Sequence, residues 1–286
     1  MNRSDLTTAY LRAVDLDVDA PTPETLDELV RRHVATFAFS SVGPRLGDDL
    51  PLAPDALLDR IVVRRRGGYC FEHNGLLFEV LDELGYEPRL VLARVLLSGN
   101  PHPALTHRVS IVEVVGVPHV VDVGFGGSGP HLAVPLGGDV VGSDWRRFRV
   151  VEVRPGHWCM QALAGADWVP LYRFELHEYG ASDVELGHFW SHRSPKASFT
   201  NALVVSRILD DEVRSLRDRD YRVLRPTGDE QRTVDDAELR DLLANELDVH
   251  VSPDEAARLL LPTPDSDEGD PHPLEPQRGS PHESAG

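Results

Sequence analysis

Apolar residues recur at helical spacing through the first ninety residues of the chain. Thr22 can cap a helix that begins at Pro23, and Leu26, Leu29 and Val30 then fall on one face. The same reasoning predicts two more helices, one that opens at Pro54 and one over residues 70–84. Residues 1–90 are therefore expected to form a helical domain.

The period of the pattern changes after Pro88. Short runs rich in Val, Leu and aromatic residues follow one another, separated by Gly and Pro. Such runs are typical of antiparallel strands in a barrel or sandwich. The expected strands are 89–97, 107–115, 119–125, 145–153, 157–163 and 168–176.

The pattern is mixed after Ser191. Residues 197–209 and 220–226 are predicted as strands, whereas 235–247 and 252–261 are predicted as helices. Residues 263–286 have no apolar periodicity and are rich in Pro, Gly, Ser and acid, so a disordered tail is expected there.

Composition and charge narrow the classes of function. The 286 residues are 41% hydrophobic and 27% charged, as in a globular protein, and no apolar run approaches the roughly 20 residues of a membrane span. The net charge of −18 disfavours nucleic-acid binding, because phosphate neutralisation needs a basic surface. The first residues lack a signal-peptide core, and only two cysteines occur, so we expect a cytoplasmic protein with free thiols and no membrane partner.

Cys70 is the first candidate for chemistry. It follows Gly67 and Gly68, which allow a tight turn and close approach of a ligand, and it stands where a helix is expected to begin. The free amides and dipole of a helix N-terminus favour a thiolate and can stabilise an oxyanion. This context favours a nucleophile over an inert buried thiol.

His107 and Asp122 supply a base and an orienting carboxylate. Each is a lone polar residue in an apolar strand, where a charge is costly unless it is paired. If residues 115–116 form the turn between these strands, Asp122 lies opposite Val109 and His107 is its diagonal neighbour on the same face. Together with Cys70 they predict a nucleophile–base–carboxylate triad.

Two other residues, His73 and Cys159, are weaker candidates for a functional role. His73 stands three residues after Cys70, a spacing found in zinc sites, but no second cysteine pair supports a metal there. Cys159, between Trp158 and Met160, has no helix start or glycine beside it and is interpreted as an ordinary strand residue. We therefore expect no metal.

The runs RGGYCFEHN, THRVSIV and VDVGFGG closely resemble the arylamine N-acetyltransferase family, as does the later segment DVELGHFWSHRSPKASFTNALVV. The likeness extends to about Leu261. It implies an α+β fold with a helical bundle at 1–90, an antiparallel β-barrel at 91–190 and an α/β lid at 191–262. It also implies a Cys-His-Asp triad of the cysteine-protease or transglutaminase type, made of Cys70, His107 and Asp122.

The resemblance further implies an acyltransferase with ping-pong kinetics. Acetyl-CoA is the expected co-substrate, no cofactor is bound, and an arylamine, arylhydrazine or N-hydroxyarylamine is the acceptor, as in xenobiotic metabolism. Lys196 and Arg193 are candidates to offset the negative charge of CoA, but a pair of solvated surface charges is the favoured interpretation. The expected substrate-binding residues are Phe39, Thr106, Phe125, Gly126 and Gly127.

One position departs from the family pattern. The family commonly has a segment like IPFEN, and this chain has FAFSS, with Ser40 in place of the glutamate. The usual ion-pair partner of an arginine such as Arg66 is then missing, and Glu72 is a candidate to replace it.

Three other functions share this set of residues. An amide synthase that closes a macrolactam uses the same triad, and a thiol hydrolase or transglutaminase-like enzyme has the same order of Cys, His and Asp. A binding module that keeps the fold without catalysis is the third, and an intact triad argues against it.

Overall fold

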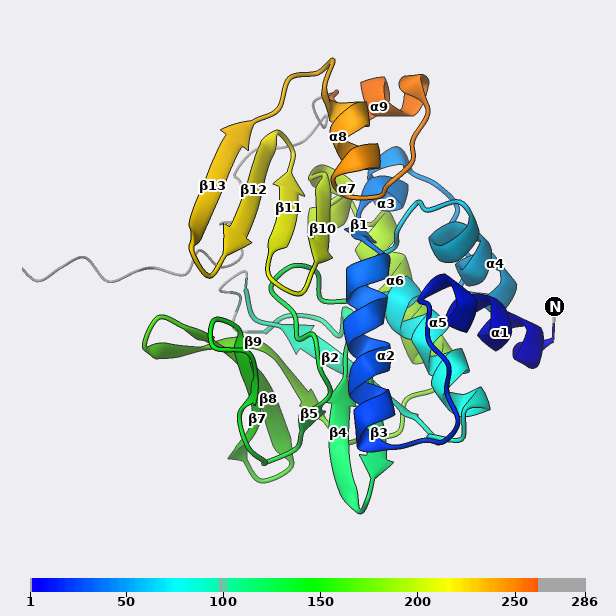
Figure 1. Ribbon diagram of the computed structural model, residues 1–286, viewed down its shortest axis with the longest axis vertical. Coiled ribbons are helices and arrows are strands. Elements are labelled where there is room, and N and C mark those ends of the chain that lie inside the picture. Colours follow the sequence, from blue (N-terminus) through cyan, green and yellow to red (C-terminus); the bar gives the residue numbers. More distant parts are fainter. Residues whose placement is uncertain (1, 98–99, 101, 262–286) are drawn as a thin grey trace, which may run out of the picture.

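The computed structural model describes residues 2–97, 100 and 102–261 (Figure 1). The expected tail over 263–286 lies outside these residues. Helices lie on one side of the molecule, a large sheet forms the lower part of the view and a smaller sheet the upper part. No helix of the described residues is both long and apolar enough to cross a lipid bilayer.

Helices dominate the first part of the chain, as the apolar spacing predicts. Thr22 Oγ1 accepts from Thr25 N at the start of α2 (Pro23–Thr36), whose apolar stripe is buried. The helix expected from Pro54 begins there but continues as a π-helical turn, η1 (Asp59–Val63). The other helices of this part are α1 (Arg3–Ala13), α3 (Val42–Leu46), α4 (Pro54–Leu58) and α5 (Cys70–Glu83).

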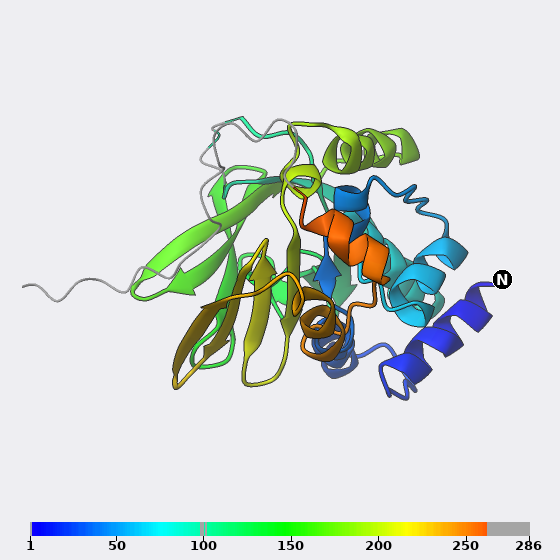
Figure 2. The same cartoon turned by 90° about the horizontal axis from the view of Figure 1, so that it is seen from above.

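The middle of the chain forms an eight-stranded antiparallel sheet in the order β5-β4-β3-β2-β9-β8-β7-β6. A bridge between Leu136 and Val150 links its two ends, so the sheet is a nearly closed barrel. Figure 2 shows this sheet beside the helices. Its strands are β2 (Arg89–Val95), β3 (His107–Val114), β4 (Val117–Val121), β5 (Val134–Pro135), β6 (Val141–Gly142), β7 (Arg147–Arg154), β8 (His157–Ala164) and β9 (Asp167–Glu175).

The smaller sheet has five antiparallel strands in the order β1-β10-β11-β12-β13. Strand β1 (Phe39–Ser40) comes from the first part of the chain, where only helices were expected, and pairs with β10. Strand β10 is Val204–Ile208 and β12 is Asp220–Arg225. Two more strands of this sheet were not predicted: β11 (Val213–Arg217) lies next to β10, and β13 (Gly228–Thr233) is an exposed polar edge without an apolar pattern.

Residues 197–209 are not one strand. Ser198–Asn201 form a helical turn, α7, because Thr200 Oγ1 and Asn201 Nδ2 donate to carbonyls of residues 194–197, and the strand begins only at Val204. Helix α6 (Ala181–Arg193) was not predicted, and the expected domain boundary at residue 190 falls inside it. The last helices, α8 (Leu239–Asn245) and α9 (Pro253–Leu259), are shorter than the 235–247 and 252–261 predicted.

Candidate active site

Cys70 is the first residue of α5, and its relative exposure is 3%. Gly67 has a φ of +64°, and a Cβ at this position would lie 2.5 Å from the carbonyl oxygen of Ala38. Only glycine therefore fits where the loop passes strand β1. Gly67 was expected to give room to a ligand, but the group that approaches it is the backbone carbonyl of Ala38.

The hairpin of β3 and β4 brings His107 and Asp122 together. Val115 and Gly116 form the turn, both with positive φ, and Ser110 pairs with Val121, so Asp122 comes opposite Val109, as predicted. His107 Nε2 lies 2.7 Å from Asp122 Oδ2, and both side chains are buried. This geometry is that of a base held by a carboxylate.

Cys70 approaches the same imidazole. Its thiol hydrogen-bonds His107, whose Nε2 already faces Asp122, which leaves Nδ1 for the sulfur. The thiol also lies 3.4 Å from the carbonyl oxygen of Thr106. Burial alone would lower the pKa of His107, but the Asp122 carboxylate and Cys70 raise it to about 10. The ring is therefore an imidazolium at neutral pH.

Asn74 completes the surroundings of Asp122 and was missed from the sequence. Its Nδ2 donates to Asp122 Oδ1 (2.9 Å) and to the carbonyl oxygen of Arg108 (2.6 Å), and its Oδ1 accepts from Val123 N (2.9 Å). Gly124 N also donates to Asp122 Oδ1. Burial acts to raise the pKa of Asp122, but His107 and these donors lower it overall. A signal existed, since Asn74 stands one helical turn after Cys70.

Gly124 allows the helix and the barrel to meet. A Cβ at this position would lie 2.7 Å from Cys70 Cα and 2.7 Å from Asn74 Nδ2. Any larger residue would push the carboxylate away from the nucleophile. The glycine is therefore part of what brings the three candidate side chains together.

Two aromatic rings enclose the imidazole. The Phe125 ring meets that of His107 edge-on at 5.2 Å between centroids, and the Tyr172 ring lies 4.8 Å from it. Burial and the nearby Asp122 carboxylate hold the pKa of Tyr172 well above its usual range. Tyr172 went unnoticed in the sequence, because an aromatic residue within an apolar strand gives no sign of what it faces.

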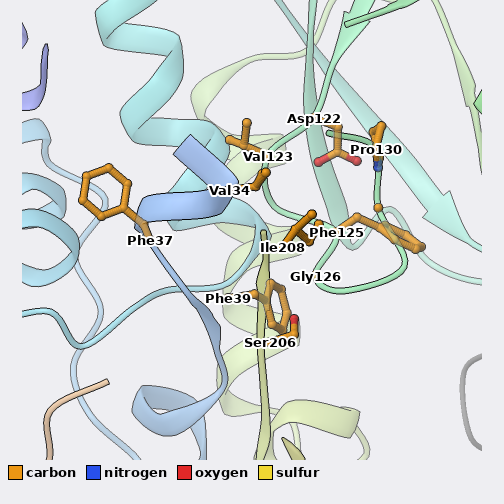
Figure 3. Close-up of a pocket in the computed structure, with 11 residues that line it drawn as sticks. Val34, Phe37, Phe39, Asp122, Val123, Phe125, Gly126, Pro130, Ser206 and Ile208 are labelled. Atoms are coloured by element: carbon orange, nitrogen blue, oxygen red, sulfur yellow. The ribbon is translucent and has the colours of Figure 1, made fainter. Parts of the chain in front are cut away.

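A small cavity adjoins Asp122 (Figure 3). Phe39, Phe125 and Gly126, three of the expected substrate-binding residues, line it. Its volume of about 10 Å³ is that of a single water, so an aromatic acceptor needs side chains to move before it fits. Gly127 packs instead against Val213 of β11.

The two basic residues considered for CoA differ in their surroundings. Arg193 donates to the carbonyl oxygen of Gly47 and pairs with Asp49 at 3.4 Å, so its charge is partly used within the protein. Lys196 is exposed at the end of the turn that follows α6.

A group of arginines lies on the other side of the Cys70 helix start. Arg60 Nε is 3.1 Å from Glu72 Oε1, whereas Arg66 pairs with Asp48 (3.3 Å) and Glu255 (2.8 Å). Glu72 therefore does not replace the missing partner of Arg66. Burial raises the pKa of Glu72 to about 7, with Arg60 opposing it.

His73 and Cys159 have structural surroundings. His73 Nε2 donates to the carbonyl oxygen of Ala38, which makes its Nδ1 the acceptor from His33 Nε2. Cys159 lies in β8, and burial raises the pKa of its thiol to about 11. Among the residues that the structure describes, no group of three or more His, Cys, Asp or Glu side chains is arranged to hold a metal ion.

Comparisons with known proteins agree with this geometry. The family model described as N-acetyltransferase matches residues 22–256. The arylamine N-acetyltransferase of Mycobacterium tuberculosis is 35% identical over 87% of this chain and 90% of its own. An arylamine N-acetyltransferase / N-hydroxyarylamine O-acetyltransferase of Salmonella typhimurium is 33% identical over 67% of this chain and 68% of its own.

A solved structure is similar throughout. The structure of Mycobacterium marinum arylamine N-acetyltransferase in complex with CoA aligns with a TM-score of 0.83 at 32% identity. The alignment covers 88% of this chain and 98% of that one. The α+β architecture expected from the sequence is thereby confirmed.

Proposed function

Since the chain belongs to the arylamine N-acetyltransferase family, we propose that Cys70, His107 and Asp122 are the triad through which it moves an acetyl group. The chain is an acetyl-CoA-dependent arylamine N-acetyltransferase. The observation that supports the triad is the hydrogen-bonded series from Cys70 through His107 to Asp122 at the first turn of α5.

The first half-reaction acylates Cys70. The imidazolium of His107 stabilises the thiolate, which attacks the thioester carbonyl carbon, and the oxyanion forms beside the amides of the first turn of α5. The C–S bond to CoA then breaks, and the CoA thiolate takes a proton from His107. The products are acetyl-Cys70, CoA and a neutral imidazole.

Acylation itself prepares His107 for the second half-reaction. Two of the causes that raise its pKa, the hydrogen bond and the charge of Cys70, disappear when the sulfur carries an acetyl group. The neutral imidazole then takes the proton of the attacking amine, the amide forms, and the Cys70 thiolate leaves. Asp122 holds the ring by Nε2 in both steps and keeps Nδ1 directed at the substrate.

The acceptor is proposed to be a small aromatic amine or hydrazine, or an N-hydroxyarylamine as in the name of the Salmonella relative. Phe125 and Phe39 offer ring faces beside Asp122, and Thr106 lies at the sulfur. Gly126 lines the cavity and Gly127 follows it in the same loop, and both are proposed to let the substrate approach the backbone. A cytoplasmic location is proposed as well, because a thiol nucleophile stays reduced there.

Mass spectrometry of the intact protein tests the mechanism directly. Acetyl-CoA alone is expected to add one acetyl group, and peptide mapping is expected to find it on Cys70. Addition of an arylamine then removes the group and yields the acetylarylamine. Modification of Cys159 instead, or loss of the acetyl group to water alone, contradicts the proposal.

A further inference from the structure

The loop before the nucleophile is tied to a distant part of the chain. His250 N donates to the carbonyl oxygen of Arg65 (2.9 Å), and Arg65 Nη1 lies 3.3 Å from Asp248 Oδ2. Arg66 Nη1 lies 2.8 Å from Glu255 Oε2. We propose that residues 248–255, the C-terminal brace, hold residues 64–69, the nucleophile loop, so that Asp248 and Glu255 are positioning residues for acyl transfer.

The nucleophile loop has a backbone that needs such support. Arg65 has a φ of +50°, in the left-handed region that residues with a Cβ rarely adopt. Its side chain is fixed at three places, by Asp248, by the carbonyl oxygen of Thr36 (3.2 Å) and by the Phe37 ring 5.1 Å away. These contacts and the bond from His250 N hold a conformation that the local sequence does not favour.

A shift of the loop reaches the site directly. Gly68 O accepts from Ser40 N (2.6 Å), and Gly68 bridges to Phe39, which lines the cavity beside Asp122. Two residues later Cys70 begins α5. The loop therefore sets both the start of the nucleophile's helix and the position of a cavity wall, and a displacement below about 1 Å is enough to slow an acyl transfer.

Within the C-terminal brace, Glu255 provides the negative charge that pairs with Arg66. Ser40 carries no charge, and its Oγ accepts from Val42 N. Burial acts to raise the pKa of Glu255, but its bonds to Arg66 and Ser252 lower it overall. The carboxylate is therefore ionised at neutral pH.

Solvent ions can reach this pair. An open hollow of about 610 Å³ lies beside it, lined by Arg64, Arg66 and Ser252 among others. Because salt screens charges that water reaches, the brace is expected to weaken at high ionic strength.

The test replaces the carboxylate by an amide of the same shape. Glu255→Gln and its double variant with Asp248→Asn are compared with Glu246→Gln, which removes an ion pair with Arg214 (2.7 Å) in the same part of the chain. We expect single-turnover acetylation of Cys70 to slow by roughly three- to tenfold in Glu255→Gln and further in the double variant. The control is expected to keep the parent rate at a similar melting temperature.

A second measurement avoids CoA, because salt also screens the interactions of its negative charges with the protein. Alkylation of Cys70 by neutral iodoacetamide is expected to slow in about 1 M potassium chloride in the parent, and to respond less in Glu255→Gln. Equal rates for both brace variants and the control, or equal salt responses, overturn the inference. The inference rests on the proposed function, in which Cys70 is the nucleophile. If the parent protein takes no acetyl group from acetyl-CoA, that proposed function is refuted independently of the brace variants.

Discussion

The first turn of α5 is held from two sides that differ in burial and chemistry. On the barrel side His107 and Asp122 are 2% and 1% exposed, and their hydrogen bond is 2.7 Å long. On the opposite side the Arg66 and Glu255 side chains are 10% and 28% exposed and form an ion pair that lines an open hollow. The two sides are therefore expected to respond differently to substitution, pH and salt.

This difference indicates that the two sides support acyl transfer in different ways. A buried hydrogen-bonded group acts in a low dielectric, so each atom of the Asp122 network has a large effect on the protonation of His107. The Arg66–Glu255 pair is partly buried but borders solvent, so it contributes less energy than a buried network and acts mainly through geometry. Substitutions on the barrel side should change chemistry, and those on the arginine side should change alignment and stability.

The largest effect is expected from Asp122→Asn. An amide can donate where the carboxylate only accepts, so the tautomer of His107 is no longer fixed, and the imidazolium loses its neighbouring negative charge. Acyl transfer should fall by about two orders of magnitude or more, by analogy with about 10⁴ in a serine triad. The measurement is the single-turnover rate on protein shown by circular dichroism to be folded.

Asp27→Asn is the matched control, because Asp27 is a partly buried aspartate that accepts from Ala133 N (3.0 Å). It should keep the parent rate, because the amide oxygen of asparagine can accept the same hydrogen bond. A folded Asp122→Asn protein with nearly the parent rate would remove Asp122 from the mechanism.

The next largest effect is expected from Asn74→Asp. This change places a second carboxylate against Asp122 Oδ1 and the Arg108 carbonyl, so a donor is lost and two negative charges repel each other at neutral pH. The rate should fall roughly ten- to a hundredfold at neutral pH, a loss of about 1.4–2.7 kcal/mol in transition-state stabilisation. The introduced carboxyl regains a donor when it is protonated, so the variant's rate relative to the parent should rise as the pH falls.

Asn245→Asp makes the same change of charge at an exposed helix position. The pH profiles of the two variants therefore separate a local effect from one of net charge. A pH-independent ratio for Asn74→Asp would show that Asn74 only fills space.

The barrel side was predictable because its partners are close along the chain. A two-residue turn fixes the register of β3 and β4, and that register alone places Asp122 near His107. The place of Asn74 one helical turn after Cys70 was the only signal for it, because a buried polar residue in a helix does not reveal its partner. The register of one hairpin thus places two of the three proposed triad residues, whereas the approach of Cys70 depends on the packing of α5 against β3.

The arginine side was not predictable in this way. Arg66 and Glu255 are 189 residues apart, and an ion pair leaves no periodic signal in a sequence. Strand β1 is two residues long, so its pairing with β10 was equally invisible. When the partner of a charged residue lies in a distant segment, only the structure identifies it.

A smaller effect is expected from Glu72→Gln, and it concerns stability. The pKa of Glu72 rises from an ordinary 4.5 to about 7 on folding, so the folded state holds a proton more tightly than the unfolded state. This group therefore lowers the stability as the pH rises from about 4.5 to about 7, by up to a few kcal/mol. Glu72→Gln should remove that slope.

The quantity to measure is the difference in unfolding free energy between Glu72→Gln and the parent across this pH range. The variant should gain on the parent as the pH rises. A constant difference would mean that Arg60, 3.1 Å away, keeps Glu72 ionised throughout.

The smallest effect is expected from Asp48→Asn, where the two arginines meet. Asp48 Oδ2 lies 3.6 Å from Arg60 Nη1 and 3.3 Å from Arg66 Nη2, and its side chain is 30% exposed. Each arginine keeps a nearer carboxylate, Glu72 or Glu255, so the loss should stay below about 1 kcal/mol of stability and about twofold in acylation rate. Denaturant unfolding and single-turnover acetylation measure both quantities. A tenfold loss of rate would mean that Asp48, rather than Glu255, is the carboxylate that fixes Arg66, and the arginine side would then be controlled from within the first fifty residues of the chain.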